Sequence, residues 1–202
     1  MEFRESAHGV LHPVGLERRR ALFAGAALLA LPQLGWSQRS DQTPALDVPY
    51  VPTPQPVVDK MLEMAKVGSS DVVYDLGCGD GRIVITAAKV HGARGVGVDL
   101  NPVRIQEAQA NAKSAGVTDK VQLRVANIFE TDVSPASVVT LYLLPTINRK
   151  LRPQLWRQLR VGTRVVSHAF DMGDEWPPER TEQVDHRTVY YWTIKEEHKK
   201  RA

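Results

Sequence analysis

Three glycines and two aspartates cluster in the stretch VVYDLGCGDGRIV, residues 72–84, in a spacing that serves ligand binding. Gly77, Gly79 and Gly81 alternate over five positions, after an apolar run that ends near Asp75. Glycine lets the backbone bend sharply, and its missing side chain lets a flat or bulky ligand lie against the peptide planes. Acidic neighbours repel phosphate and attract positive charge. The stretch therefore predicts a site for a cationic ligand on bare backbone.

Two common phosphate-binding loops do not match this stretch. A P-loop needs Gly-Lys and then Ser or Thr after its glycines, whereas Gly81 is followed by Arg82 and Ile83. The dinucleotide pattern G-x-G-x-x-G would put its last glycine at Arg82, a poor fit for close packing of helix on strand. The remaining pattern, G-x-G-x-G after an acidic strand end, suits a ligand that carries an amine and a sulfonium. We therefore expect S-adenosylmethionine.

The ends of the next two predicted strands supply side chains for the rest of this ligand. Asp99 lies about twenty residues past the glycines, where a carboxylate can accept hydrogen bonds from both ribose hydroxyls, and its neighbour Leu100 belongs to the same predicted site. One strand later, Asn127 is expected to hydrogen-bond the adenine edge and Ile128 to cover the adenine face. Asp99 has an alternative role as a helix cap, and Asn127 has one as a turn residue that satisfies local backbone.

Alternating strands and helices must position these residues. A first helix is expected after Thr53 as N-cap, with Pro54 in its first turn, and Asn101 and Gly116 are expected to bound a later helix. The expected strands are Val72–Asp75, Gly95–Asp99, Val121–Val125, Val138–Leu143, Arg164–His168 and Arg187–Ile194, and the helices between them are Gly81–Val90, Pro102–Ala115 and Asn148–Leu159. This alternation is typical of a parallel sheet with helices on both faces. Such sheets bind ligands at the carboxyl ends of their strands.

Composition limits the classes of protein to consider. A chain of 202 residues is long enough for one well-buried domain and too short for two comfortable ones. The formal charge is only +3 and most charges are interspersed, so no nucleic-acid-binding footprint is visible and no nucleic-acid partner is expected. The single cysteine, Cys78, excludes an internal disulfide and a multi-cysteine metal site, and we expect no metal.

The N-terminal region differs from the rest of the chain. Three arginines at 18–20 precede an apolar run from Ala21 to about Leu34. Residues 1–37 are therefore predicted to be an export signal or a membrane anchor, with a wrongly chosen start codon as the other alternative. Residues 38–53 are expected to form a linker, and residues 54–196 the ligand-binding domain.

Residues from about 45 to 195 resemble a class I methyltransferase. The stretches VPYVPTPQPVVDKML, YDLGCGDGRIVI, GVDLNP and VVTLYLLP are similar to a small family with mitochondrial lysine methyltransferases for the ATP synthase c subunit and the adenine nucleotide translocase, and with bacterial relatives. The resemblance implies a Rossmann-like α/β fold: a mostly parallel seven-stranded sheet, helices on both faces and an antiparallel C-terminal strand. It also implies methylation of a protein lysine, often on a membrane protein. LYLLP stands where general amino-methyltransferases have Asp/Asn-Pro-Pro-Tyr/Phe, which argues against nucleic-acid bases or small amides as substrates.

Three residues are candidates for handling such an acceptor. A lysine must lose a proton from a pKa near ~10.4, and a dry, partly aromatic pocket helps by destabilising the ammonium. Tyr142 is expected to line this pocket, with Tyr50 from the linker, while His168 and Asp171 are candidates for taking or relaying the proton. Each has a structural alternative: Tyr142 as packing at a strand end, His168 as a structural histidine, and Asp171 as a turn former before Gly173.

The sequence leaves three functional hypotheses and an open location. The favoured hypothesis is a methyltransferase acting on a protein amine. The alternatives are a non-catalytic S-adenosylmethionine-binding or sensor module and a methyltransferase for a small molecule. The expected partners are a protein substrate and, through residues 1–37, a membrane. Three arginines before the apolar run predict export, whereas S-adenosylmethionine is kept in the cytoplasm, so the side of the membrane stays undecided.

Overall fold

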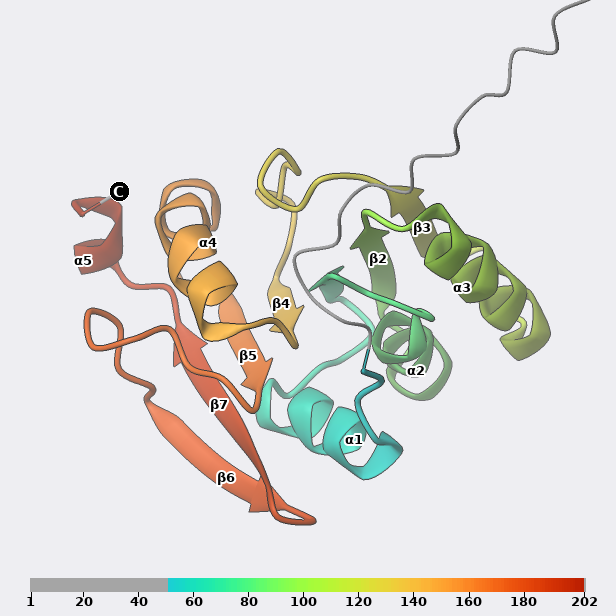
Figure 1. The fold of residues 1–202 in the computed structure, drawn as a ribbon, viewed down its shortest axis with the longest axis horizontal. Helices are drawn as coiled ribbons and strands as arrows, with labels where there is room; N and C mark the ends of the chain where they lie inside the picture. Colours follow the sequence, from blue (N-terminus) through green and yellow to red (C-terminus); the bar gives the residue numbers. More distant parts are fainter. Residues whose placement is uncertain (1–50, 202) are drawn as a thin grey trace, which may run out of the picture. The chain divides into compact units, whose positions relative to one another are not determined.

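A computed structural model describes residues 51–201, in which strands and helices alternate along the chain (Figure 1). The sequence predictions for Pro102–Ala115, Val121–Val125 and Arg164–His168 are confirmed to the residue. The elements are α1 (Gln55–Met64), β1 (Val72–Leu76), α2 (Arg82–His91), β2 (Arg94–Asp99), α3 (Pro102–Ala115), β3 (Val121–Val125), β4 (Val138–Leu141), α4 (Pro145–Gln158), β5 (Arg164–His168), β6 (Arg180–Val184), β7 (Arg187–Thr193) and α5 (Glu196–Lys199).

The strands form one seven-stranded sheet in the order β3-β2-β1-β4-β5-β7-β6. The five strands from β3 to β5 pair in parallel, whereas β7 runs antiparallel to β5 and β6 antiparallel to β7. The expected mostly parallel sheet is therefore confirmed, but its antiparallel part is a hairpin of two strands. The strand order reverses at β1, between β2 and β4, and parallel sheets bind ligands at such a point.

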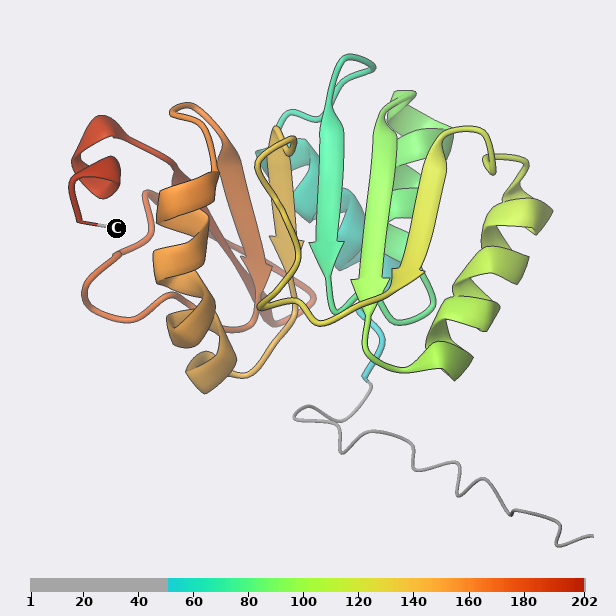
Figure 2. The ribbon, with the colours of Figure 1, turned by 90° about the horizontal axis from the view of Figure 1, so that it is seen from above.

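Helices cover both faces of the sheet (Figure 2). Successive strand residues point to opposite faces, so Val73 packs with α1 and α2, whereas Tyr74 packs with α4. Burial on both faces explains the mostly apolar sequences of β1 and β4. Within residues 51–201, no helix is both long enough and apolar enough to cross a membrane.

The helix boundaries follow their capping residues, with two corrections. Asn101 caps α3 as expected, since its side chain accepts a hydrogen bond from the Val103 amide, and Gly116 ends this helix in a left-handed conformation. Thr53 does not cap α1, because the N-cap is Pro54 and no side chain caps that end. Gly81 precedes α2 as its left-handed N-cap and is not its first helical residue.

Three other expectations differ from the structure. β4 ends at Leu141, so Tyr142 and Leu143 lie beyond the strand, and α4 begins at Pro145, three residues before the predicted Asn148. β6 was not predicted, because its sequence RTEQV is polar and largely exposed at the edge of the sheet. The predicted signal or anchor, residues 1–37, lies outside the described residues, as does Tyr50.

Candidate active site

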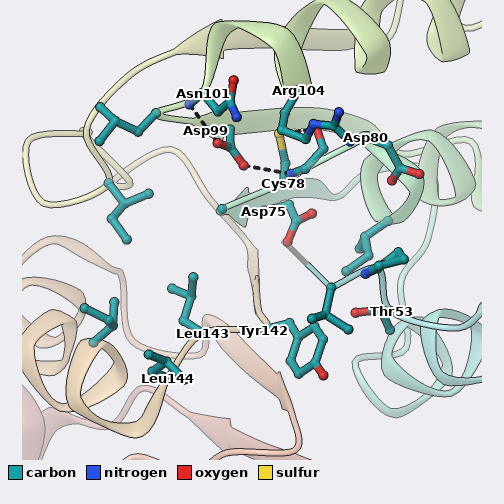
Figure 3. A pocket seen from close by; sticks show the side chains of 18 of the residues that line it. Thr53, Asp75, Cys78, Asp80, Asp99, Asn101, Arg104, Tyr142, Leu143 and Leu144 are labelled. Carbon is teal, nitrogen blue, oxygen red and sulfur yellow. Dashed lines mark hydrogen bonds between the residues drawn. The ribbon is translucent and has the colours of Figure 1, made fainter. Parts of the chain in front are cut away.

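A pocket of about 280 Å³ opens at the carboxyl ends of β1, β2, β3 and β4. It lies where the strand order reverses, as the sheet topology predicts. Figure 3 shows Asp80 and Asp99 on one side of the pocket, Tyr142, Leu143 and Leu144 on the other, and Asp75 between them. The predicted site residues that line the pocket are Asp75, Gly77, Gly79, Asp99, Leu100, Asn127, Ile128 and Tyr142.

The glycine loop brings bare backbone to the pocket. Gly77 and Gly79 have φ angles of 83° and 53°, a region that other residues rarely adopt. A Cβ atom at Gly77 would lie 2.8 Å from Leu143 Cδ2, so the missing side chain also keeps the pocket open beside Leu143. Gly81 does not line the pocket; a Cβ there would lie 3.0 Å from Ala108 Cβ, so this glycine allows close packing of α2 on α3.

Asp99 is held in place by two backbone amides. Its Oδ2 atom accepts from the Gly79 amide and its Oδ1 atom from the Asn101 amide, each at 2.9 Å. The cap of α3 is Asn101 and not Asp99, so the alternative role of Asp99 as a helix cap is not what the structure shows. Because each carboxylate oxygen has more than one lone pair, Asp99 retains acceptor capacity toward the pocket.

Asp75 is a buried carboxyl group that faces the same pocket. Only 3 % of its surface is exposed, and its Oδ1 atom accepts from the Thr140 hydroxyl at 2.8 Å. Burial raises the pKa of Asp75 to about 7, and the neighbouring charges of Asp99 and Asp80 add to this rise. Asp80 is ion-paired with Arg82, so a cationic ligand would chiefly relieve the repulsion that Asp99 exerts on the Asp75 carboxyl group.

Asn127 and Ile128 reach the pocket from the end of β3. The Asn127 Oδ1 atom accepts from the Phe129 amide at 3.0 Å, and its Nδ2 atom donates to Glu130 at 3.1 Å. The side chain thus forms the local turn that was its structural alternative. The Ile128 carbonyl accepts from Gln154 of α4, which ties this loop to the helix.

Of the three residues expected to handle the acceptor, only Tyr142 lines the pocket. Its ring lies 3.9 Å from the His168 ring and 6.3 Å from the Phe170 ring, measured between centroids. His168 is 2 % exposed and lies behind Tyr142, outside the pocket lining. Asp171 is exposed, is absent from the lining, and accepts from the Gly173 amide at 3.0 Å, as expected of its alternative role in a turn.

Several lining residues were not predicted. Leu144, Ile147, Phe129 and Phe170 give the pocket much of its apolar wall, and all follow closely after strand ends. Their position after strand ends was the only sequence signal that they line a pocket, and this signal is weak because apolar residues at such positions can also pack in the hydrophobic core. Residues 51–53, which were expected to belong to the linker, also line the pocket. They lie within the stretch YVPTP, which is part of the sequence that resembles the methyltransferase family.

The pocket fits S-adenosylmethionine on its own chemistry. Asp99 presents acceptor capacity for ribose hydroxyls, and Leu100 and Ile128 give apolar surface for a flat ring. The bare backbone at Gly77 and Gly79 leaves room that side chains would fill. The carboxyl group of Asp75 suits the cationic end of the ligand, whereas Asp80 is paired with Arg82.

Known proteins match this chain over the same region. The family model of the ANTKMT methyltransferase domain matches residues 75–180. A protein-lysine N-methyltransferase from Saccharolobus islandicus is 50% identical over 154 residues, 74% of this chain and 95% of that protein. The mouse ATP synthase c-subunit lysine N-methyltransferase is 30% identical over 155 residues, 75% of this chain but only 62% of its own length.

A solved structure agrees with the sequence comparisons. The RNA methyltransferase from Salinibacter ruber in complex with S-adenosyl-L-homocysteine is 60% identical, covers 72% of this chain and 95% of its own, and superposes with a TM-score of 0.71. The relatives named as enzymes argue against a non-catalytic sensor module. The chain therefore belongs to the S-adenosylmethionine-dependent methyltransferase family of the ANTKMT methyltransferase domain.

Proposed function

We propose that this enzyme transfers a methyl group from S-adenosylmethionine to the amine of a lysine side chain on a protein. Two relatives support the acceptor by name: the protein-lysine N-methyltransferase from S. islandicus and the mouse lysine N-methyltransferase for the ATP synthase c-subunit.

The division of the pocket into two chemically different halves is the observation that carries the proposal. One half contains the carboxyl groups of Asp75, Asp80 and Asp99 together with Arg82 and Arg104, and Asp80 is ion-paired with Arg82. The other half is formed mainly by apolar and aromatic side chains, and the Thr53 hydroxyl belongs to it: Val51, Pro52, Thr53, Tyr142, Leu143, Leu144, Ile147 and Phe170. No acidic or basic side chain of the described residues lines this second half. A cationic donor suits the first half, and a neutral amine on an aliphatic chain suits the second.

The second half favours the neutral form of a lysine. A lysine has a pKa of ~10.4 in water, and removal from water disfavours the ammonium form. Without a carboxylate beside it, the ammonium gains no ion pair that would offset desolvation. The amine lone pair is the nucleophile, so the apolar wall raises the fraction of acceptor that can react.

Positioning supplies most of the remaining rate. S-adenosylmethionine supplies a methyl group on a positively charged sulfur, which needs little acid catalysis to leave. In this proposal Asp99 would hold the ribose, Ile128 and Leu100 would lie against the adenine, and the backbone of Gly77 and Gly79 would leave room for the ligand. Tyr142 bounds the space where the acceptor nitrogen lies. Holding two reactants in line accelerates a reaction strongly even without acid or base groups.

RNA is the second candidate acceptor, because the 60% identical structure from Salinibacter ruber is named as an RNA methyltransferase. The two candidates differ in their products, since one gives methylated lysine and the other gives methylated nucleosides. A small-molecule acceptor would leave both macromolecular fractions unlabelled.

The test is incubation of the purified enzyme with methyl-tritiated S-adenosylmethionine and separate protein and RNA fractions of a cell extract. Proteins are then hydrolysed to amino acids and RNA to nucleosides before chromatography. We expect label in Nε-methylated lysine, and far less of it when Asp99→Ala replaces the wild-type enzyme at a limiting concentration of S-adenosylmethionine. Label confined to nucleosides or to small molecules would overturn the lysine assignment.

A further inference from the structure

Thr53 contacts both halves of the pocket at once. It is 4 % exposed, although the two residues before it are exposed, and it lines the pocket directly before α1. Its carbonyl accepts from Arg82 Nη1 at 2.9 Å, and its hydroxyl shares a hydrogen bond with His168 Nδ1 at 3.3 Å. These partners lie 29 and 115 residues away along the chain; Arg82 lines the pocket, and His168 lies behind Tyr142.

On the donor side, Arg82 connects Thr53 to the glycine loop. Arg82 Nε donates to both carboxylate oxygens of Asp80, at 2.9 and 3.1 Å, and Nη2 donates to Asp80 Oδ2 at 2.5 Å. Asp80 stands between Gly79 and Gly81, so this pair fixes the guanidinium against the loop. The third nitrogen of the guanidinium holds the Thr53 carbonyl, and so the loop and the segment 51–53 are joined.

On the acceptor side, His168 connects Thr53 to Tyr142. The His168 ring is buried and stands 3.9 Å from the Tyr142 ring, with an angle of 34° between their planes. The next residue, Ala169, has a φ of 64°, a left-handed conformation that costs a non-glycine residue about 1 kcal/mol or more. This turn of the backbone leads directly to Phe170, which lines the pocket and stacks on Tyr142.

We infer that Thr53 is a positioning residue for methyl transfer: its hydroxyl fixes the Tyr142 wall through His168, while its carbonyl fixes the glycine loop through Arg82. One residue thereby sets the distance between the wall for the acceptor and the loop for the donor. The inference rests on the proposed methyl transfer at this pocket, but not on whether the acceptor is a lysine. His168 acts through its contacts with Thr53 and Tyr142 and does not itself reach the reacting atoms.

The environment of His168 agrees with this role and not with proton transfer. Burial, with the charge of Arg187 as a smaller contribution, lowers the pKa of His168 to about 4. The ring is therefore neutral at pH 7 and a weak base. It is also absent from the residues that line the pocket, so an acceptor proton would have to pass Tyr142 to reach it.

The test compares Thr53→Val, which keeps the shape and the carbonyl but removes the hydroxyl, with Thr53→Ser, which keeps both polar groups. Initial rates are measured with whichever fraction the wild-type enzyme labels, whether protein or RNA, and S-adenosylhomocysteine affinity is measured by calorimetry. We expect Thr53→Val to lower kcat about tenfold, with the Kd for S-adenosylhomocysteine within about twofold of wild type. Thr53→Ser should retain most of kcat.

A double-mutant cycle with His168→Phe tests the path through the histidine. Phenylalanine keeps a ring beside Tyr142 but cannot bond Thr53, so we expect about the same tenfold loss, and no further loss when both substitutions are combined. The inference is overturned if Thr53→Val and wild type have equal kcat, or if Thr53→Ser loses as much as Thr53→Val. It is also overturned if His168→Phe loses several orders of magnitude more, as removal of a proton acceptor would. Label on RNA would instead refute the lysine proposal and leave this comparison intact.

Discussion

Replacement of Asp75 by asparagine should stabilise the ligand-free enzyme while it damages the site. In the folded protein the pKa of Asp75 is about 7, against 3.8 for an ordinary aspartate, because the carboxyl group is buried beside Asp80 and Asp99. Between these two values the folded state keeps a proton that the unfolded state has lost. The free energy of unfolding therefore falls as the pH rises from about 4 to about 7, and stays at the lower level above pH 7.

The magnitude follows from the size of this pKa difference. About three units, at 1.36 kcal/mol each, correspond to about 4 kcal/mol of stability lost by pH 8. About two of these three pKa units lie between pH 5 and pH 7. The free energy of unfolding of Asp75→Asn should therefore exceed that of wild type by about 3 kcal/mol more at pH 8 than at pH 5. Asparagine can still accept from the Thr140 hydroxyl through its side-chain oxygen, so the variant keeps that contact.

Urea unfolding of ligand-free protein, monitored by tryptophan fluorescence at pH 5, 6, 7 and 8, measures this difference. Asp119→Asn is the matched control, because Asp119 is exposed in the turn between α3 and β3. That variant should follow the wild-type pH dependence. Parallel pH profiles for Asp75→Asn and wild type would refute the reasoning, since they would mean that Asp75 is already ionised in the folded protein at pH 5.

Further predictions concern the ligand and the N-terminal segment. Asp99→Ala should weaken S-adenosylhomocysteine binding about 100-fold in calorimetry, because a charged acceptor for two ribose hydroxyls is lost; an unchanged Kd would contradict the ribose assignment. Gly77 and Gly116 both have a positive φ, so Gly77→Ala and Gly116→Ala should each lower the free energy of unfolding in urea by about 1 kcal/mol. Only Gly77→Ala should weaken S-adenosylhomocysteine binding, because a Cβ atom at Gly77 meets Leu143, whereas one at Gly116 meets nothing within 4 Å. Wild-type affinity for S-adenosylhomocysteine should rise about tenfold from pH 6 to pH 8 as Asp75 ionises beside the ligand ammonium, and a flat profile would remove Asp75 from that contact. A tagged full-length chain should fractionate with membranes or be exported, unlike a chain that lacks residues 1–37, and identical fractionation of the two would exclude a targeting role for that segment.

Much of the donor half of the site could be predicted because it depends on local sequence. The glycine loop, the acidic strand end at Asp99 and the cap at Asn101 each fix the conformation of a few consecutive residues. In a parallel sheet, all such strand ends lie along one edge, so residues far apart in the sequence meet there without further information. Asn127 was placed correctly at the pocket, and the structure shows in addition that its side chain is used in the local turn.

The acceptor half depended on contacts between distant parts of the chain. His168 and Asp171 both follow β5, but the left-handed turn at Ala169 leaves one behind Tyr142 and the other at the surface. β6 is a strand only because it pairs with β7, since its own sequence has little strand propensity.

By itself, then, the sequence determined the order of strands and helices from α1 to β5, the bare loop and the carboxyl groups around it. It did so because glycine spacing, capping residues and apolar runs act over short stretches of backbone. Only the tertiary structure decided that Thr53, expected to end the linker, forms hydrogen bonds with both Arg82 and His168. It also decided that burial raises the pKa of Asp75 to about 7. Both depend on burial and on neighbours brought in from other strands, which no local pattern specifies.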